Sequence, residues 1–382
     1  MKKYISLLFL IFSLSTSYVF GYYNYDDFID FLVHSNQFRA RLDRLGFKLE
    51  TTGVHVTAGF AGFGGGNIIS SSTANKYATN GTDAFKFTPS PIVGVGYKMP
   101  VFGIGAGYQY TYDEKYQIHT PIITMTALDD NIRLSVPVSV GIGYKENTNW
   151  MGISTIAEAR YYFNLPFMSH LRLYVKYGEY NNRTLQDAKK SSFGLAARLY
   201  FRVELDDLLI EPIIRVHYDQ AIEKNNDNFE ITAQNRGGFS TSIDYKNQNP
   251  NDLALIRNAY FFKIDQPYRI GVALPVGFTA GNDFITMYIE PALSFSVISG
   301  KRIYDSNFNG ISEGKTRTAP FYSFSYLVYG EFYVKPTPSL EWYTELQTGG
   351  VSVGGFNRAN GITEFVFNAT TGLTWYFNLG NN

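Results

Sequence analysis

Charged side chains of opposite sign gather in two separate parts of this 382-residue chain. In segments where polar and apolar residues alternate, basic residues hold polar positions between residues 132 and 218, and acidic residues hold them between 285 and 353. If these positions line a pore, the two walls create a transverse electric field that orients small polar solutes. The alternative is ordinary luminal polarity, in which each charge has a local partner such as Glu158 or Glu211. The pore-lining candidates are Arg133, Arg160, Arg172, Lys176, Arg198, Arg202 and Arg215 on the basic side and Glu290, Glu331, Glu341 and Glu345 on the acidic side.

A second group of oxygen ligands lies in the stretch "DSNFNGISE". Asp305, Asn307 and Asn309 alternate, a glycine follows, and Glu313 comes next, as at the start of a calcium-binding loop. A full loop of this kind needs a glutamate near its end, where this chain has a threonine. We therefore expect calcium binding to be weak at best, and the alternative is an ordinary loop rich in Asn and Gly. We expect no other cofactor.

The sequence does not predict catalysis. His217 and Asp219 are the one acid–base pair that would lie together near the end of a strand. No nucleophile can be assigned to this pair, and the sequence contains nothing like a phosphate-binding loop or a zinc cluster. We interpret the pair as the polar end of a strand, and an outer-membrane enzyme is a minor alternative.

The elements that carry these residues are predicted to be strands. In "IRLSVPVSVGIGY", apolar side chains alternate strictly with small or polar ones. Each such segment has the length, roughly 10 residues, that a tilted strand needs to cross a bilayer. Aromatic residues near the segment ends are typical of membrane interfaces. The segments are 54–60, 102–112, 132–144, 151–163, 171–180, 193–203, 208–218, 268–278, 285–297 and 365–377.

The connections between these segments alternate between short turns and long loops. This alternation predicts antiparallel hairpins with short periplasmic turns and long external loops. We therefore predict an all-β fold, a closed antiparallel transmembrane β-barrel of about 14 strands, because only a closed barrel pairs every backbone group in lipid. The long stretch 219–267 has room for another hairpin, so about 16 strands is the alternative. A soluble β-sandwich is the competing interpretation.

Composition and the first residues agree with export to a membrane. The start, "MKKYISLLFLIFSLSTSYVFGYY", combines two lysines, an apolar run and small residues, which is the pattern of a secretory signal peptide. The chain has 33 basic and 33 acidic residues, so no excess charge indicates a nucleic-acid partner. It contains no cysteine, and its 30 Tyr and 31 Phe favour strands.

Residues 22–46 differ from the rest of the chain because their apolar side chains recur at helical spacing. The inward positions of the first strands are mostly Gly and Ser, which leaves a trough that a helix could occupy. We expect an amphipathic helix inside the lumen, and the alternative is a helix in the periplasm or on the membrane surface. The luminal packing candidates are Phe28, Phe31, Phe38 and Leu42. The expected organisation is a signal peptide at 1–21, this helix at 22–46 and the barrel at 47–382.

The stretch "DFLVHSNQFRARLDRLGF", after a signal peptide and before a Gly-rich strand with a "GF" step, resembles a known family. It is similar to the N-terminus of the variable surface proteins of Serpulina and Brachyspira spirochaetes. The resemblance is strongest over 24–60 and compositional beyond. It implies an abundant outer-membrane surface antigen without an assigned enzymatic activity, and it carries no site residues across.

These features together predict a surface-exposed outer-membrane protein that forms a passive, weakly selective, porin-like channel. The alternative is a surface interaction protein or adhesin with a closed lumen, whose loops bind host surface molecules or antibodies. The expected partners are therefore outer-membrane lipid and small polar solutes, with no nucleic acid. The sequence leaves the solute and the oligomeric state open.

Overall fold

The computed structural model describes residues 25–41, 44–61, 69–72, 89–112, 116–143, 150–163, 165–182, 189–223, 229, 231, 233, 262–300, 302–305, 316–317, 320–355 and 358–377. Within these residues, 16 antiparallel strands form one closed barrel. In order around the barrel they are β1 (Gln37–Arg41), β2 (Arg44–Thr51), β3 (Val54–Ala61), β5 (Ser90–Lys98), β6 (Phe102–Tyr112), β7 (Tyr116–Ala127), β8 (Ile132–Gly143), β9 (Trp150–Tyr162), β10 (Met168–Asn182), β11 (Lys189–Phe201), β13 (Leu208–Ala221), β15 (Tyr268–Gly281), β16 (Ile285–Ser299), β19 (Phe321–Thr337), β20 (Leu340–Gly355) and β21 (Arg358–Tyr376).

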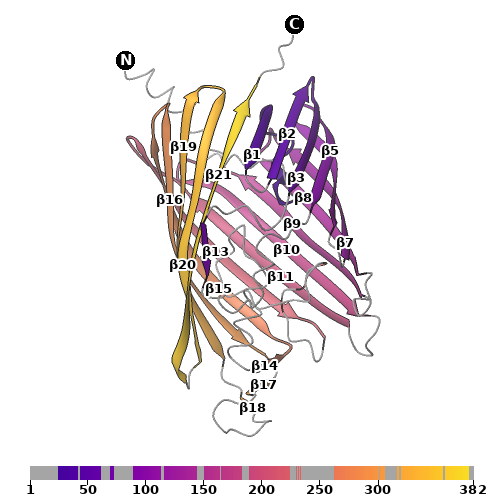
Figure 1. Ribbon diagram of the computed structural model, residues 1–382, viewed down its shortest axis with the longest axis vertical. Coiled ribbons are helices and arrows are strands. Elements are labelled where there is room, and N and C mark those ends of the chain that lie inside the picture. Colours follow the sequence, from indigo (N-terminus) through magenta and orange to yellow (C-terminus); the bar gives the residue numbers. More distant parts are fainter. Residues whose placement is uncertain are drawn as a thin grey trace.

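The barrel closes where its first strand meets its last (Figure 1). β1 pairs with β2 on one side and with β21 on the other, and both pairings are antiparallel. Two short strands extend the wall, since β4 (Ile69–Ser72) pairs with β21 and β12 (Val203–Leu205) pairs with β13. A separate small sheet of β14 (Phe262–Asp265), β17 (Arg302–Asp305) and β18 (Thr316–Arg317) lies at the end of the barrel opposite β1 and β2.

The outside of the barrel is apolar and its inside is polar. On β8, Ser135 and Ser139 are 4% and 8% exposed, whereas Ile132 and Ile142 on the other face are 38% and 45% exposed. Exposed apolar side chains recur in this way around the wall, and only lipid can cover such a surface favourably. The predicted closed antiparallel barrel is therefore confirmed, and the strand count is 16, the alternative, rather than about 14.

The two additional strands come from the N-terminal segment and not from 219–267. The predicted amphipathic helix at 22–46 is wrong, because a single 3-10 turn, η1 (Tyr25–Asp30), is followed by β1 and β2. Within the described residues, no helix is both long and apolar enough to cross a membrane.

The physical reason is that residues 37–51 also alternate with period two. Gln37, Arg39 and Lys48 are buried in the lumen, whereas Leu45 and Phe47 are 49% and 36% exposed on the lipid face. As strands, these residues pair their backbone with β3 and β21, which a helix could not do. β21, the partner of β1, is more than 300 residues away in the sequence. No local sequence pattern reveals a pairing over such a separation.

Candidate functional site: the luminal arginine belt

Five arginines stand side by side across five successive strands, and we call them the arginine belt. Arg133 on β8 faces Arg160 on β9, and Arg160 also faces Arg172 on β10. Arg172 faces Arg198 on β11, which in turn faces Arg215 on β13. Side chains of directly opposed residues start about 5 Å apart, and like charges at such positions destabilise a sheet. The belt therefore needs counter-charges or a function that offsets this repulsion.

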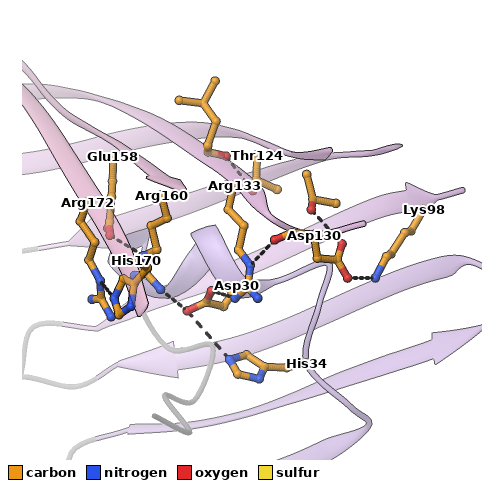
Figure 2. A network of polar contacts seen from close by, with 12 residues as sticks. Asp30, His34, Lys98, Thr124, Asp130, Arg133, Glu158, Arg160, His170 and Arg172 are labelled. Carbon is orange, nitrogen blue, oxygen red and sulfur yellow. Dashed lines mark hydrogen bonds and ion pairs between the residues drawn. The ribbon is translucent and has the colours of Figure 1, made fainter. Parts of the chain in front are cut away.

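One counter-charge comes from a residue that lies in the lumen and is not part of the barrel wall. Asp30, at the end of η1, receives a hydrogen bond from Arg133 Nη1 to Oδ1 at 2.6 Å and another from Arg160 Nη1 to Oδ2 at 2.7 Å (Figure 2). Arg160 Nε donates to Glu158 Oε1 at 2.5 Å. The four side chains of this ion-pair cluster are between 8% and 16% exposed, and charge-assisted hydrogen bonds of this kind are the strong ones.

The middle of the belt is held by aromatic and imidazole groups. Arg172 Nε donates to His170 Nε2 at 2.9 Å, and the Arg172 guanidinium lies 4.7 Å from the centre of the Tyr200 ring. The Arg198 guanidinium lies 4.7 Å from the Tyr174 ring. Cation–π contacts keep a guanidinium in place without neutralising its charge. Both guanidiniums therefore keep their charge in these contacts.

The acidic wall begins where the belt ends. Arg215 Nη2 lies 3.0 Å from Glu290 Oε1, and Tyr288 OH donates to the other oxygen of Glu290. Arg41, on β1, forms an ion pair with Glu345 at 3.2 Å. Basic and acidic walls therefore both exist, but some of their charges are paired locally.

The remaining acidic candidates have polar neighbours of their own. Glu331 accepts hydrogen bonds from Tyr329 OH and, at 2.6 Å, from Tyr333 OH. Glu341 lies 3.4 Å from Lys335 Nζ. Tyr donors leave the charge of Glu331 in place, whereas Glu341, like Glu290 and Glu345, has a cation beside it.

Two basic candidates lie outside the belt. Arg202 Nε donates to Glu204 at 2.6 Å, and Lys176 Nζ lies 3.8 Å from Asp219. Asp219 also receives hydrogen bonds from Arg269, at 3.1 Å from Nε and at 2.5 Å from Nη2. An Asp219 held by two cations is a weaker partner for His217 than the sequence indicated, although the absence of catalysis stays a prediction.

Residues 28–32 dock inside the barrel against the predicted trough of glycines. Phe28, Phe31 and Leu32 are at most 1% exposed and form one cluster with Ile92 and Ile122. A Cβ on Gly105 would lie 3.2 Å from the Phe31 ring, and one on Gly103 would lie 3.2 Å from Leu32. Cβ atoms at Gly94 and Gly107 would overlap the Phe28 ring. Bare backbone at these four positions is what admits the segment.

The other two luminal packing candidates do not join this cluster. Phe38 lies on β1 directly between Phe47 and Trp375, which are 36% and 52% exposed on the lipid side. Leu42 lies outside the described residues. Asp30 is 6% exposed and points into the belt (Figure 2).

A second internal segment narrows the lumen farther from the short turns. Phe229, Ile231 and Ala233 are nearly buried. Ile231 N donates to Ser192 Oγ at 2.8 Å, and Ala233 N donates to Ser154 Oγ at 2.9 Å. A Cβ added at Gly141, Gly152 or Gly178 would overlap the backbone of this segment. The backbone of the internal segment can therefore approach the wall closely because these three wall positions are glycines.

Electrostatics fix the protonation states of the docked N-terminal segment, which lies before the membrane-spanning strands. Burial alone would raise the pKa of Asp30, but Arg160, His34 and Arg133 outweigh it and hold that pKa well below its ordinary range. Burial lowers the pKa of His34 to about 4, and Arg133 pushes it in the same direction while Asp30 opposes it. At neutral pH the segment therefore presents a carboxylate and a neutral imidazole.

The candidate calcium loop lies mostly outside the described residues. Asp305 ends β17, and Asn307, Asn309 and Glu313 lie outside the described residues. Among the residues that the structure does describe, no group of three carboxylate, histidine or cysteine side chains could hold a metal ion. Weak calcium binding stays a prediction.

Comparison with known proteins gives one extensive match. The family model described as Serpulina hyodysenteriae variable surface protein matches residues 2–376. A search of curated proteins finds no match.

Among solved structures, the chain is similar to a bacterial polysaccharide outer membrane secretin, with a TM-score of 0.46, 10% identity, and coverage of 90% of this chain and 99% of that one. OmpT of Vibrio cholerae gives 0.36 and 9%, with 90% and 97% covered. OccK3 of Pseudomonas aeruginosa gives 0.37 and 9%, with 90% and 94% covered. At these scores the likenesses say nothing about activity.

Proposed function

We propose that this chain, which belongs to the Serpulina hyodysenteriae variable surface protein family, forms a narrow, porin-like channel through the outer membrane. The barrel is an outer-membrane surface protein of that family. The observation that carries the channel proposal is the arginine belt. Five guanidiniums in register repel one another, and Asp30, Glu158 and Glu290 offset part of this repulsion. Water in an open channel would offset more of it, because it solvates the guanidiniums.

The two internal segments set the expected width of the channel. Residues 28–32 pack on β5 and β6, and the amides of Ile231 and Ala233 bond to β11 and β9, so the two segments take space in different parts of the lumen. Solutes must then pass between polar walls at close range, where charge controls permeation. We expect a small conductance with ion selectivity that depends on the belt.

The same internal segments favour a second function, a surface interaction protein with a closed lumen. Nearly complete burial of Phe28, Phe31 and Phe229 is what a filled barrel would show. In that case the external loops bind host surface molecules or antibodies and no solute crosses. The two functions differ in one measurable property, which is ionic current.

Planar-bilayer recording of the refolded chain tests the channel. Arg172→Gln with Arg198→Gln removes two belt charges, so the reversal potential under a salt gradient should shift toward cation preference, most strongly at low ionic strength. The control is Lys189→Gln, because this lysine pairs with Glu179 at the exposed end of β11, away from the belt. An absence of current from folded protein would contradict the channel and support the closed lumen. Current with an unchanged reversal potential would refute the role of the belt.

A further inference from the structure

We propose that Arg133 and Arg160 form a binding site for small carboxylate solutes, and that Asp30 occupies this site as a built-in competitor. The inference rests on the proposed channel for solute access from bulk water. It adds the class of solute and a means of control. The observation behind it is that the carboxylate in the site does not belong to the barrel wall.

The geometry of the site matches a carboxylate group. The two Nη1 atoms come from adjacent strands, β8 and β9, and each contacts a different oxygen of Asp30, at 2.6 and 2.7 Å. Two donors spaced to take the two oxygens of one planar group select carboxylates over spherical anions such as chloride.

Neighbouring groups hold both guanidiniums in this arrangement without Asp30. Arg160 Nε is already bonded to Glu158, which leaves Nη1 directed at the site. The Arg133 guanidinium lies 4.4 Å from the centre of the Tyr162 ring, and Arg133 Nε donates to the carbonyl of Asp130 at 3.3 Å. These contacts remain if Asp30 leaves, so the two guanidiniums stay in place. Binding a solute then costs little side-chain entropy.

The next member of the belt extends the site. Arg172 stands opposite Arg160, about 5 Å away at the Cβ atoms, and carries a third guanidinium. A dicarboxylate such as succinate could place one group where Asp30 lies and direct the second toward Arg172. We therefore expect dicarboxylates to bind more tightly than acetate.

Asp30 can leave because its element is not part of the wall. η1 makes no strand pairing, and the segment is held by apolar packing on glycines and by the Asp30 ion pairs. A tethered group acts at an effective concentration in the millimolar range. A free carboxylate must exceed this concentration to displace it, so the native chain should bind succinate weakly.

Removing the competitor tests the site directly. Titration calorimetry of the full chain in detergent should show at least a tenfold tighter succinate affinity in Asp30→Asn than in the native chain. Adding Arg133→Gln or Arg160→Gln to that variant should abolish the gain, whereas Lys189→Gln should leave it intact. Acetate should bind more weakly than succinate, and phosphate at the same ionic strength shows whether any oxyanion suffices. Unchanged affinity in folded Asp30→Asn would overturn the proposal, as would phosphate binding as tightly as succinate.

A second measurement uses the native Asp30 and does not depend on the folding of that variant. Phe31→Cys with Gly105→Cys should form a disulfide in the docked state, since a Cβ on Gly105 would lie 3.2 Å from the Phe31 ring and the chain has no other cysteine. Succinate should slow oxidation of this pair at least threefold relative to sodium chloride of equal ionic strength. Equal rates would refute the competition. Neither experiment measures current, so a closed lumen that still binds succinate would refute the channel and leave the site standing.

Discussion

Mild acid should weaken the docking of the N-terminal segment. The reason is that the buried environment of His34 disfavours the protonated, charged form of its imidazole. The folded-state pKa of His34 is about 4, below the ordinary 6.5, so the contribution to docking is fully present above pH 6.5 and is lost as pH falls through 4. The whole shift corresponds to about 3 kcal/mol, of which about 2 kcal/mol is lost by pH 5. The pKa of Asp30 lies well below its ordinary range, so this carboxylate stays charged in that window.

Hydrogen exchange of the segment measures this loss. The amides of Phe31, Val33 and His34 donate to Phe28 and Asp30 carbonyls, so they are protected only while η1 is formed. After correction for intrinsic rates, about 2 kcal/mol predicts roughly 30-fold lower protection at pH 5 than at pH 7.5.

The matched control is His34→Gln, because His55 and His170 on the barrel strands are also exposed to the change in pH. Arg133 and Arg160 face His34 and stay charged over this range, and Lys48, the third cation that faces it, is present in both proteins. The variant should keep its protection at pH 5. Protection that is the same at both pH values in the native chain, or an equal fall in the variant, would show that the reasoning about His34 is wrong.

Two further predictions concern the wall and the second internal segment. Val138→Arg puts a charge on the lipid face of β8 and should lower barrel stability by roughly 2–4 kcal/mol, seen as loss of heat-resistant gel migration, whereas Val138→Leu should not. Ser154→Ala removes the acceptor of the Ala233 amide and should weaken the docking of Ala233 by about 1 kcal/mol. Faster exchange of the Ala233 amide is the expected result, and unchanged exchange would mean that the hydrogen bond does not hold the segment.

The barrel was predictable because its signal is local. Each strand shows two chemically different faces, and the period of two requires no knowledge of its neighbours. Ser135 and Ile142 could be assigned to opposite sides from a dozen residues of sequence. The membrane reverses which side is polar but leaves the period unchanged.

The N-terminal strands were missed because one pattern fits two structures. Phe38 and Leu45 fit helical spacing, but Phe38 and Ala40 also alternate with Arg39 and Arg41 on β1. Short apolar patterns of this kind cannot separate helix from strand. The deciding factor is the available edge of β21, which is distant in sequence.

The sequence predicts the face on which the belt arginines lie but not their alignment across strands. Parity placed its arginines on the inner face, but their alignment depends on strand register, which turns determine. Arg160 and Arg172 are equidistant from Pro166, and Arg198 and Arg215 are equidistant from the turn at 206–207. Counting outward from tight turns would have found these two pairs. The sequence between β8 and β9 has no such tight-turn signal, so the Arg133 pairing could not be counted in this way.

The seam between β1 and β21 has a consequence for how the barrel is made. β1 spans only Gln37–Arg41, and its partners on β21 lie between Gly372 and Tyr376, at the far end of the chain. Of all the pairings in the wall, this one closes the longest loop, so its chain-entropy cost is the largest and it should form last. Until it forms, the sheet is an open ribbon, and the last strand of the chain offers a free edge to which another strand can add.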